Sequence, residues 1–180
     1  MSKTQYDSVQ ILLHWLMALL ICAAFGLAWT MEDMPLSPAK FKMISWHKWA
    51  GITVLGLVAI RLIWLKIKGA PAADPGLPAW QSRLSIGVHH LLYLLMFAMP
   101  ISGWLMSSAK GFPVVYLGLW KLPDLIAKNP EQADFFGNSH GLFATALLIL
   151  IGLHAAAALK HHFIDKDTIL ARMLPFLRKK

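Results

Sequence analysis

Hydrophobic residues occur in four long runs along the chain, separated by polar or proline-rich stretches. The runs cover about residues 9–30, 44–65, 84–107 and 138–159. Each run is long enough to cross the hydrocarbon core of a bilayer, which takes about 20 helical residues. Glu32 and Asp33 follow the first run, and residues 69–78, with three prolines, separate the second from the third. The pattern predicts an all-α fold, a four-transmembrane-helix bundle forming one integral membrane domain over residues 1–180.

The first run lies near the amino terminus, where cleaved signal segments occur. It is longer than the apolar core of a signal peptide, about 7–15 residues, and it lacks a convincing cleavage site. The bulky Ile21 directly before Cys22 also argues against lipoprotein processing. We therefore expect the first run to remain in the protein as a helix. Cys22 is the one cysteine of the chain, so no disulfide can form within it.

Composition narrows the class of protein further. Apolar residues make up 57% of the 180 residues and charged residues 14%, against about 25% charged residues in soluble domains. A chain of this size cannot bury so much apolar surface in a water-soluble globule. This balance excludes a nucleic-acid-binding domain and a disordered protein, and the single cysteine excludes a disulfide scaffold. We expect membrane lipid around the helices.

The basic residues predict the orientation of the bundle, because Lys and Arg concentrate on the cytoplasmic side of membrane proteins. Eleven fall at the end that holds both termini, against four acidic residues: Lys3, Arg61, Lys66, Lys68, Arg83, Lys160, Lys166, Arg172, Arg178, Lys179 and Lys180. Six fall at the opposite end, against five acidic residues: Lys40, Lys42, Lys48, Lys110, Lys121 and Lys128. We therefore expect both termini to be cytoplasmic and the opposite end to be periplasmic.

Histidines stand out within the four runs, where ionisable side chains are costly and so suggest function. Six lie inside the expected spans: His14, His47, His89, His90, His140 and His154. Some of them would serve as hydrogen-bonding links between helices in a purely structural interpretation. That interpretation is weakened because almost no carboxylate lies within the spans to pair with them.

The spacing of the histidines favours a pair of haem groups. His140 and His154 are 14 residues apart, nearly four helical turns, so they share a face about 21 Å apart along the helix axis. His14 matches the depth of His154, and His47 matches the depth of His140. Two stacked haem groups, each held by two imidazoles, suit electron transfer. Zinc is disfavoured because neither depth offers a third or fourth ligand.

Two other positions bear on the same chemistry. Arg61 lies 14 residues after His47, on the same face and at the depth of the cytoplasmic histidine pair. It would pair with haem propionates, or it would anchor the helix end by snorkelling to the interface; both interpretations remain open. His89 and His90 lie near the cytoplasmic side, where a structural role is favoured over contact between His89 and a haem propionate.

Several segments resemble the prokaryotic cytochrome b561 family. They are "ILLHWLMALL", "WHKWAGITVLGLVAIRLIW", "HHLLYLLMFAMPISGWLMS", "GFPVVYLGL" and, most specific of all, "IGLHAAAALKHHFIDKDTILARMLP". The resemblance covers nearly the whole chain. It implies a small four-helix cytochrome of the bacterial inner membrane that holds two haem b groups and is linked to ubiquinone. The implied iron ligands are His14, His47, His140 and His154, and the implied histidine on the quinone side is His161.

The resemblance leaves two activities open. One is a superoxide:ubiquinone oxidoreductase, which takes electrons from periplasmic superoxide and reduces ubiquinone. The other is the haem b anchor subunit of a hydrogenase or formate dehydrogenase, which receives electrons from a periplasmic partner. The compact chain favours the stand-alone oxidoreductase. A proton or solute transporter is disfavoured, since the spans lack acidic relay residues and paired broken helices.

Basic residues suggest how each side of the membrane is used. On the periplasmic side, Lys40, Lys42 and Lys48 surround His47, with Lys110 at the same level. Their field would steer a small anionic donor, above all through Lys48; interface anchoring or docking of an acidic partner subunit remain alternatives.

On the cytoplasmic side, we expect ubiquinone to accept electrons beside the haem of His14 and His154. His161 would serve there as proton donor or hydrogen-bond partner, because imidazole exchanges protons near neutral pH. The basic tail with Arg172, Arg178, Lys179 and Lys180 would hold this end at anionic headgroups.

Overall fold

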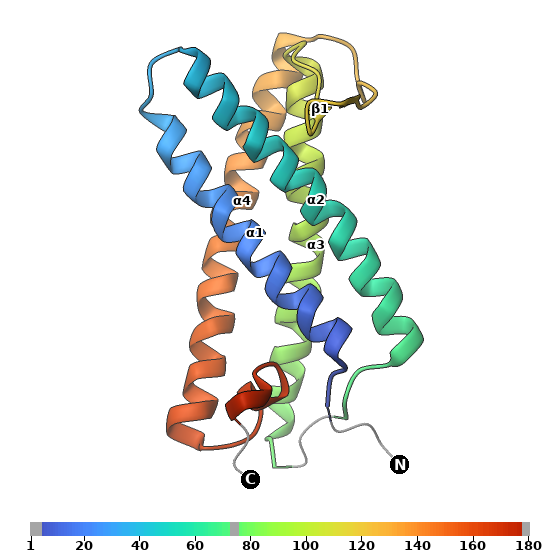
Figure 1. Ribbon diagram of the computed structural model, residues 1–180. Coiled ribbons are helices and arrows are strands. Elements are labelled where there is room, and N and C mark those ends of the chain that lie inside the picture. The colour runs from blue at the N-terminus through green and yellow to red at the C-terminus, as the bar shows by residue number, and fades with distance from the viewer. Residues whose placement is uncertain (1–4, 73–75, 178–180) are drawn as a thin grey trace.

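Four long α-helices dominate the computed structural model, which describes residues 5–72 and 76–177 (Figure 1). They are α1 (Ser8–Glu32), α2 (Pro38–Lys68), α3 (Ala79–Ala109) and α4 (Pro130–Lys160). All four are long and apolar enough to cross a membrane. The shorter elements are the strands β1 (Val115–Tyr116) and β2 (Trp120–Lys121), a π-helical turn η1 (His161–Asp165), and the 3-10 turns η2 (Leu170–Arg172) and η3 (Pro175–Leu177). The mainly helical prediction is confirmed.

The helices extend beyond the apolar runs, and two of them begin much earlier than expected. The sequence predicted starts near residues 44 and 138, whereas α2 begins at Pro38 and α4 at Pro130. In both cases a capping side chain precedes a proline at the first helical position. The cap is Ser37 for α2 and Asn129 for α4, residue types that bond to free backbone N–H groups at a helix start. Hydropathy therefore identifies the part of each helix that suits a lipid environment, whereas the capping residues show where the helix begins.

The helices are arranged as two pairs. α1 packs mainly along α2, and α3 along α4, while α2 and α3 join the two pairs. The start of α1 and the turn η3 lie at one end of the bundle, called here the terminal end (Figure 1). The strands β1 and β2 lie toward the opposite end, called here the hairpin end (Figure 1).

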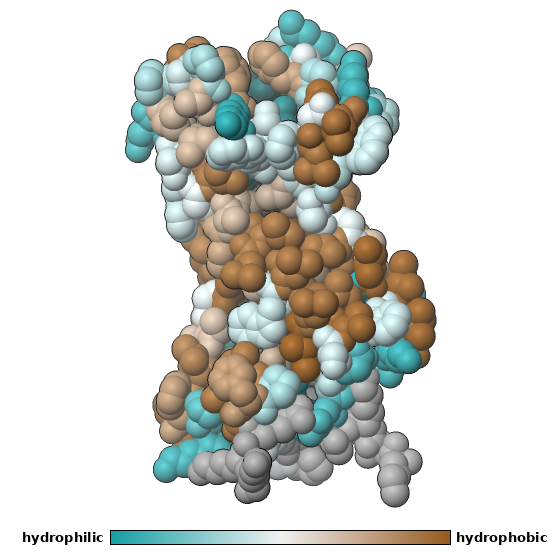
Figure 2. Space-filling model, viewed as in Figure 1, coloured by the Kyte–Doolittle hydropathy of each residue, from teal (hydrophilic) through white to brown (hydrophobic). Residues whose placement is uncertain are grey.

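The buried core lies in the middle of the bundle and draws on all four helices. Its members are Met17, Ile21, Val54, Val58, Leu92, Met96 and Leu147. Outside this core, many large apolar side chains are exposed along the helices. On the face shown in Figure 2, hydrophobic residues form a broad band across the middle of the molecule, and hydrophilic residues lie toward the two ends. A surface with many exposed apolar side chains along its helices suits a protein surrounded by lipid.

The connection between α3 and α4 contains a small β-hairpin that the hydrophobic pattern did not predict. Tyr116 pairs with Trp120 across a turn in which Leu117 and Gly118 both have positive φ. The indole of Trp49 on α2 donates a hydrogen bond to the Val115 carbonyl over 2.7 Å. Strands of two residues carry little sequence signal, and contacts with α2 such as this one hold them in place.

Candidate functional site

Two histidines from opposite helix pairs meet toward the terminal end. His14 lies on α1 and His154 on α4, and their ring centres are 6.2 Å apart with an interplanar angle of 64°. Both side chains are half-buried. The structure thus brings together the two residues whose depth in the sequence pattern matched.

A second pair of histidines meets toward the hairpin end. His47 lies on α2 and His140 on α4, and their ring centres are 6.1 Å apart with an interplanar angle of 76°. Leu147 of the buried core lies midway along α4 between His140 and His154. The core therefore separates the two histidine pairs.

The spacing within each pair fits two imidazoles bound to one metal ion. A metal–imidazole bond is about 2.0–2.1 Å long and the ring centre lies about 1 Å beyond the nitrogen, so two rings on opposite sides of an ion are separated by about 6 Å. Both pairs have this separation. The residues present therefore fit the binding of one haem iron by each pair, and the ligand assignment itself stays a prediction.

Backbone carbonyls fix the protonation of the two rings at the hairpin end. The Nδ1 of His47 lies 2.9 Å from the Ala24 carbonyl, and the Nδ1 of His140 lies 2.9 Å from the Met99 carbonyl. A carbonyl oxygen only accepts hydrogen bonds, so each Nδ1 carries the proton and donates. Each Nε2 then keeps its lone pair for a metal, the usual arrangement for a metal-binding histidine.

Helix α3 is shaped to receive the ring of His140. A Cβ added at Gly103 would lie 2.8 Å from the Cε1 atom of that ring, closer than real Cβ contacts. Ser102 is buried, donates to the Met99 carbonyl over 2.7 Å and lies 3.2 Å from the Nδ1 of His140. Sequence reasoning missed these contacts. The available signal was the sequence from Pro100 to Gly103, since proline and glycine inside a helix usually have a packing reason.

A buried arginine lies close to the histidines of the terminal end. Arg61 on α2 is only 8% exposed and interacts electrostatically with His14 and His154. Its Nη1 donates to the Gln10 carbonyl over 2.7 Å, and its Nε donates to the Tyr93 hydroxyl over 3.1 Å. This burial does not fit a snorkelling anchor. Binding of haem propionates by Arg61 stays a prediction.

A third histidine touches the pair at the terminal end. The rings of His89 and His154 have their centres 5.1 Å apart and meet edge to face, at 84°. The Nδ1 of His89 donates to the Ser85 carbonyl over 2.6 Å. His89 therefore packs against His154 although it is itself exposed, and its neighbour His90 is exposed as well. Sequence depth alone had favoured a structural role for both.

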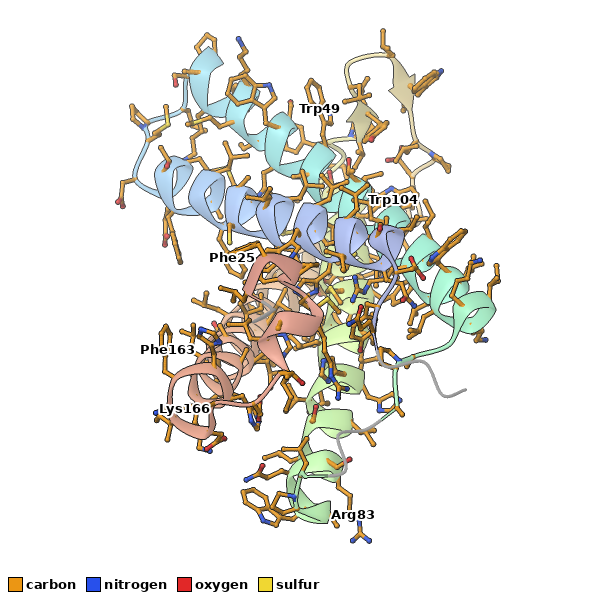
Figure 3. All side chains as sticks on the ribbon, turned by 60° about the horizontal axis from the view of Figure 1, so that its bottom comes forward. Phe25, Trp49, Arg83, Trp104, Phe163 and Lys166 are labelled. Atoms are coloured by element: carbon orange, nitrogen blue, oxygen red, sulfur yellow. The ribbon has the colours of Figure 1, made fainter. Side chains whose placement is uncertain are left out.

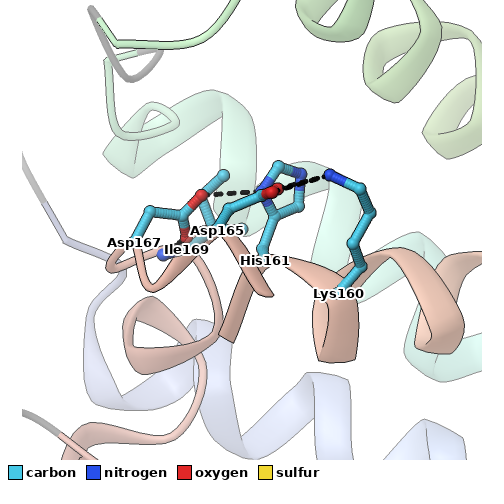
Figure 4. A network of polar contacts seen from close by, with 5 residues as sticks. All are labelled: Lys160, His161, Asp165, Asp167 and Ile169. Atoms are coloured by element: carbon cyan, nitrogen blue, oxygen red, sulfur yellow. Dashed lines mark hydrogen bonds and ion pairs between the residues drawn. The ribbon is translucent and has the colours of Figure 1, made fainter. Parts of the chain in front are cut away.

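Beyond α4, His161 forms the centre of a polar network (Figure 4). Its Nδ1 lies 2.6 Å from a carboxylate oxygen of Asp167 and 3.1 Å from one of Asp165. Lys160 forms an ion pair with Asp165 over 2.6 Å. His161, Asp165 and Asp167 lie close enough to hold a cation, but the ion pair with Lys160 already neutralises Asp165. Sequence reasoning singled out His161 and missed its acidic partners, because the π-helical turn that brings them together has no sequence signal of its own.

Lysines at the hairpin end are partly tied to the backbone. The Nζ of Lys48 donates to the Phe112 carbonyl over 3.0 Å and interacts electrostatically with Lys110. Lys40 donates to the Met34 carbonyl over 2.7 Å. The charges of Lys48 and Lys110 are close enough to interact, and the steering of an anion by the lysines of this end stays a prediction.

The expected basic tail is only partly described. Arg172 donates to the Ala72 carbonyl over 2.9 Å, which ties the turn η2 to the segment after α2. Arg178, Lys179 and Lys180 lie outside the described residues, as does Lys3. Their role at the membrane surface stays a prediction.

Comparison with known proteins gives one consistent result. Residues 5–176 match the prokaryotic cytochrome b561 family. The chain is 37% identical to cytochrome b561 homolog 2 of Escherichia coli K12, over 94% of this chain and 91% of that protein. It is 34% identical to the probable superoxide oxidase CybB of Yersinia pestis, over 95% of this chain and 96% of that protein. It is 30% identical to cytochrome b561 homolog 1 of Escherichia coli K12, over 95% of this chain and 97% of that protein.

Proposed function

Because the chain belongs to the prokaryotic cytochrome b561 family of haem-binding membrane electron-transfer proteins, we propose that it carries electrons across the bacterial inner membrane from a periplasmic donor to ubiquinone. The observation that carries this proposal is the presence of two histidine pairs, each with ring centres 6.1 to 6.2 Å apart, separated by the buried core.

Each histidine pair holds one haem b in this proposal. His14 and His154 bind one group, and His47 and His140 bind the other. Haem iron with two imidazole ligands supplies reversible one-electron transfer. The protein fixes the rings of His47 and His140 through the carbonyls of α1 and α3. Arg61 offers its charge to the propionates at the terminal end.

The terminal end faces the cytoplasm in this proposal, and the hairpin end faces the periplasm. The distribution of basic residues supports this orientation, because the predicted topology puts eleven of the 17 Lys and Arg residues of the sequence on the side that holds both termini. Electrons therefore enter beside His47 and His140 and leave beside His14 and His154.

Superoxide is the proposed donor. The relative named as a probable superoxide oxidase supports it, as do Lys48 and Lys110, whose charges raise the encounter rate of a small anion. Two superoxide anions each lose one electron and become dioxygen. Ubiquinone gains these two electrons and two protons and becomes ubiquinol.

Proton delivery to ubiquinone is assigned to His161. A protonated imidazole held by Asp167 is able to hydrogen-bond a quinone oxygen through its other ring nitrogen. Asp165 and Lys160 balance the charge of the network. The histidine is then poised to lose one proton and to be recharged from the cytoplasm.

One observation favours the second candidate function, that of a haem b anchor subunit. The β-hairpin exposes large apolar side chains at the end assigned to the periplasm. Leu117 is 48% exposed, Leu119 73% and Trp120 63%. An apolar tip of this kind suits docking by a periplasmic redox partner.

A purified single-chain assay tests the proposal. We expect two b haems per chain by haem extraction and difference spectroscopy, and rapid reduction of the haem by superoxide followed by reduction of a soluble ubiquinone. The rate should fall with rising salt and in Lys48→Ala, and Lys48→Arg should retain it because the charge remains. Lys121→Ala, on β2, is the control. Reduction only after addition of a periplasmic redox partner would favour the anchor subunit instead.

A further inference from the structure

The surroundings of the two histidine pairs differ in hydrogen bonding and in charge. We infer that the haem at the terminal end has the higher reduction potential and that Arg61 is the residue that raises it. This inference rests on the proposed ligation of one haem by each pair. It goes further because it assigns a direction of electron flow to residues that are not ligands.

At the hairpin end, the protein favours the oxidised state of a bound iron. Both ligands donate Nδ1–H to backbone carbonyls, His47 to Ala24 and His140 to Met99, each over 2.9 Å. A histidine whose N–H is bonded to a carbonyl becomes a more basic metal ligand. A more basic ligand stabilises ferric over ferrous iron and lowers the reduction potential.

At the terminal end, the ligands have no such support. In the part of the chain that the structure describes, the rings of His14 and His154 make no hydrogen bond; their neighbours are aromatic rings and Arg61. Hydrogen bonding therefore makes this haem easier to reduce than the one at the hairpin end.

Arg61 adds a buried positive charge at the terminal end. Its side chain is 8% exposed, and its hydrogen bonds go to neutral groups, the Gln10 carbonyl and the Tyr93 hydroxyl. Among the described residues it forms no ion pair with a carboxylate. A buried positive charge is screened far less than one in water. It favours the state with one more electron and so raises the potential of a group beside it.

Two further ionisable groups at the terminal end are Tyr6 and Asp7. Burial raises the pKa of Tyr6, and Tyr93 acts in the same direction while Arg61 and Arg172 oppose it. Tyr6 is therefore neutral near pH 7. Asp7 accepts hydrogen bonds from the Gln10 backbone and the Trp64 indole.

Among the described residues, four further charged groups at the two ends are paired or more exposed than Arg61. Asp165 and Asp167 are engaged with Lys160 and His161. At the hairpin end the charges of Lys48 and Lys110 are closer to solvent than that of Arg61, so salt and water screen them more strongly.

The consequence is a downhill path for electrons from the hairpin end to the terminal end. A donor such as superoxide would meet the group held by His47 and His140, and the group held by His14 and His154 would keep the electron beside the proposed quinone site until a second one arrives. Ubiquinone needs two electrons, so holding the first at the terminal end favours complete reduction. In this scheme Arg61 does not bind the iron; it acts through the buried positive charge that it places beside the histidine pair of the terminal end.

Redox titration of the purified protein, followed by the haem spectrum, tests the inference without any donor. We expect two transitions. Arg61→Gln should lower the potential of the higher one by about 59 mV or more, a tenfold change in its reduction equilibrium, and leave the lower one in place. Arg61→Lys should keep most of the potential because the charge remains. Arg83→Gln is the matched control, since Arg83 is exposed and points away from the bundle at the start of α3 (Figure 3).

Gly103→Ala assigns the transitions even if Arg61→Gln fails to fold. The new methyl group must displace the ring of His140, which lengthens its bond to the Met99 carbonyl and should raise the potential of the lower transition alone. A shift of the higher transition instead, or equal shifts in Arg61→Gln and Arg83→Gln, would overturn the inference. A haem count other than two would overturn the proposed ligation, and a lack of reaction with superoxide would overturn only the proposed donor.

Discussion

His140 is held by two features of α3 that no inspection of its own helix would find. The Met99 carbonyl accepts its Nδ1–H, and the missing side chain of Gly103 leaves room for its ring. His14 has a different setting, with an edge-to-face contact to Trp15 and no hydrogen bond among the described residues. Two residues of one type thus receive different electronic surroundings, and their loss should have separate effects.

Replacement of single histidines should remove one haem at a time. We expect His140→Leu to leave about one b haem per chain, the one bound by His14 and His154, because the buried core separates the two pairs. His14→Leu should leave the other haem. Haem extraction and low-temperature difference spectra would measure both. Loss of the His14 haem in His140→Leu would show that the pairing is wrong.

The Asp167 carboxylate should matter for quinone reduction through its bond to His161. We expect Asp167→Asn to slow reoxidation of the reduced haem by a soluble ubiquinone about tenfold or more, since positioned proton transfer contributes about 10²–10⁴-fold. His161→Ala should have a similar effect. Stopped-flow absorbance of the haem is the measurement.

Asp165→Asn is the control for this prediction. Asp165 is paired with Lys160 and lies farther from the His161 ring nitrogen, so its loss should slow reoxidation less. Equal rates for wild type, Asp167→Asn and His161→Ala would move the proton donor elsewhere, with His162 or Arg61 as the next candidates.

The sequence predicted the four candidate ligands because helical periodicity relates His140 to His154 on one helix, and because matching depth from the ends of the apolar runs relates His14 and His47 to them. It did not predict Met99, Ser102 or Asp167 as partners. Those contacts depend on how neighbouring helices are rotated and on the π-helical turn after α4, and neither property follows from a hydrophobic pattern.

At the scale of elements, the structure differs from the hydrophobic pattern at the helix caps and at the β-hairpin. The apolar runs gave the number and order of the long helices correctly. The early starts of α2 and α4 come from Ser37 and Asn129, whose polar side chains look like loop residues in a hydropathy plot. The hairpin is held in place by α2, far away in sequence.

The anchoring of the hairpin can be tested at Trp49. We expect Trp49→Phe to free the Val115 carbonyl and to weaken the docked hairpin by about 0.5–1.5 kcal/mol, the usual net contribution of one hydrogen bond. Backbone amides of residues 114–122 should exchange faster in hydrogen-exchange mass spectrometry. Trp46→Phe, one turn away and more exposed, should change little. Equal exchange in both variants would contradict the anchoring role.

At the scale of the whole molecule, the charge distribution predicts which end faces which compartment. Leu119 on the hairpin and Phe163 on η1 are exposed at opposite ends, at 73% and 68%. In a Cys22→Ala background, Leu119→Cys should react with a membrane-impermeant maleimide in cells with a permeabilised outer membrane. Phe163→Cys should react only after the inner membrane is opened. The reverse pattern would invert the orientation.

The division of the bundle into two helix pairs has a consequence for how the protein is made. Within each pair, neighbouring helices hold the histidine of the hairpin end: α1 bonds to His47, and α3 bonds to His140. Contact between the pairs rests mainly on α2 and α3, and each proposed haem would bridge from one pair to the other.

A chain cut between residues 72 and 76 should therefore yield two fragments that insert separately. Co-expressed in cells able to make haem, the fragments should copurify as a haem-bearing complex, and in cells blocked in haem synthesis they should separate. The supply of haem would then control whether the two halves, already inserted in the membrane, assemble into one complex.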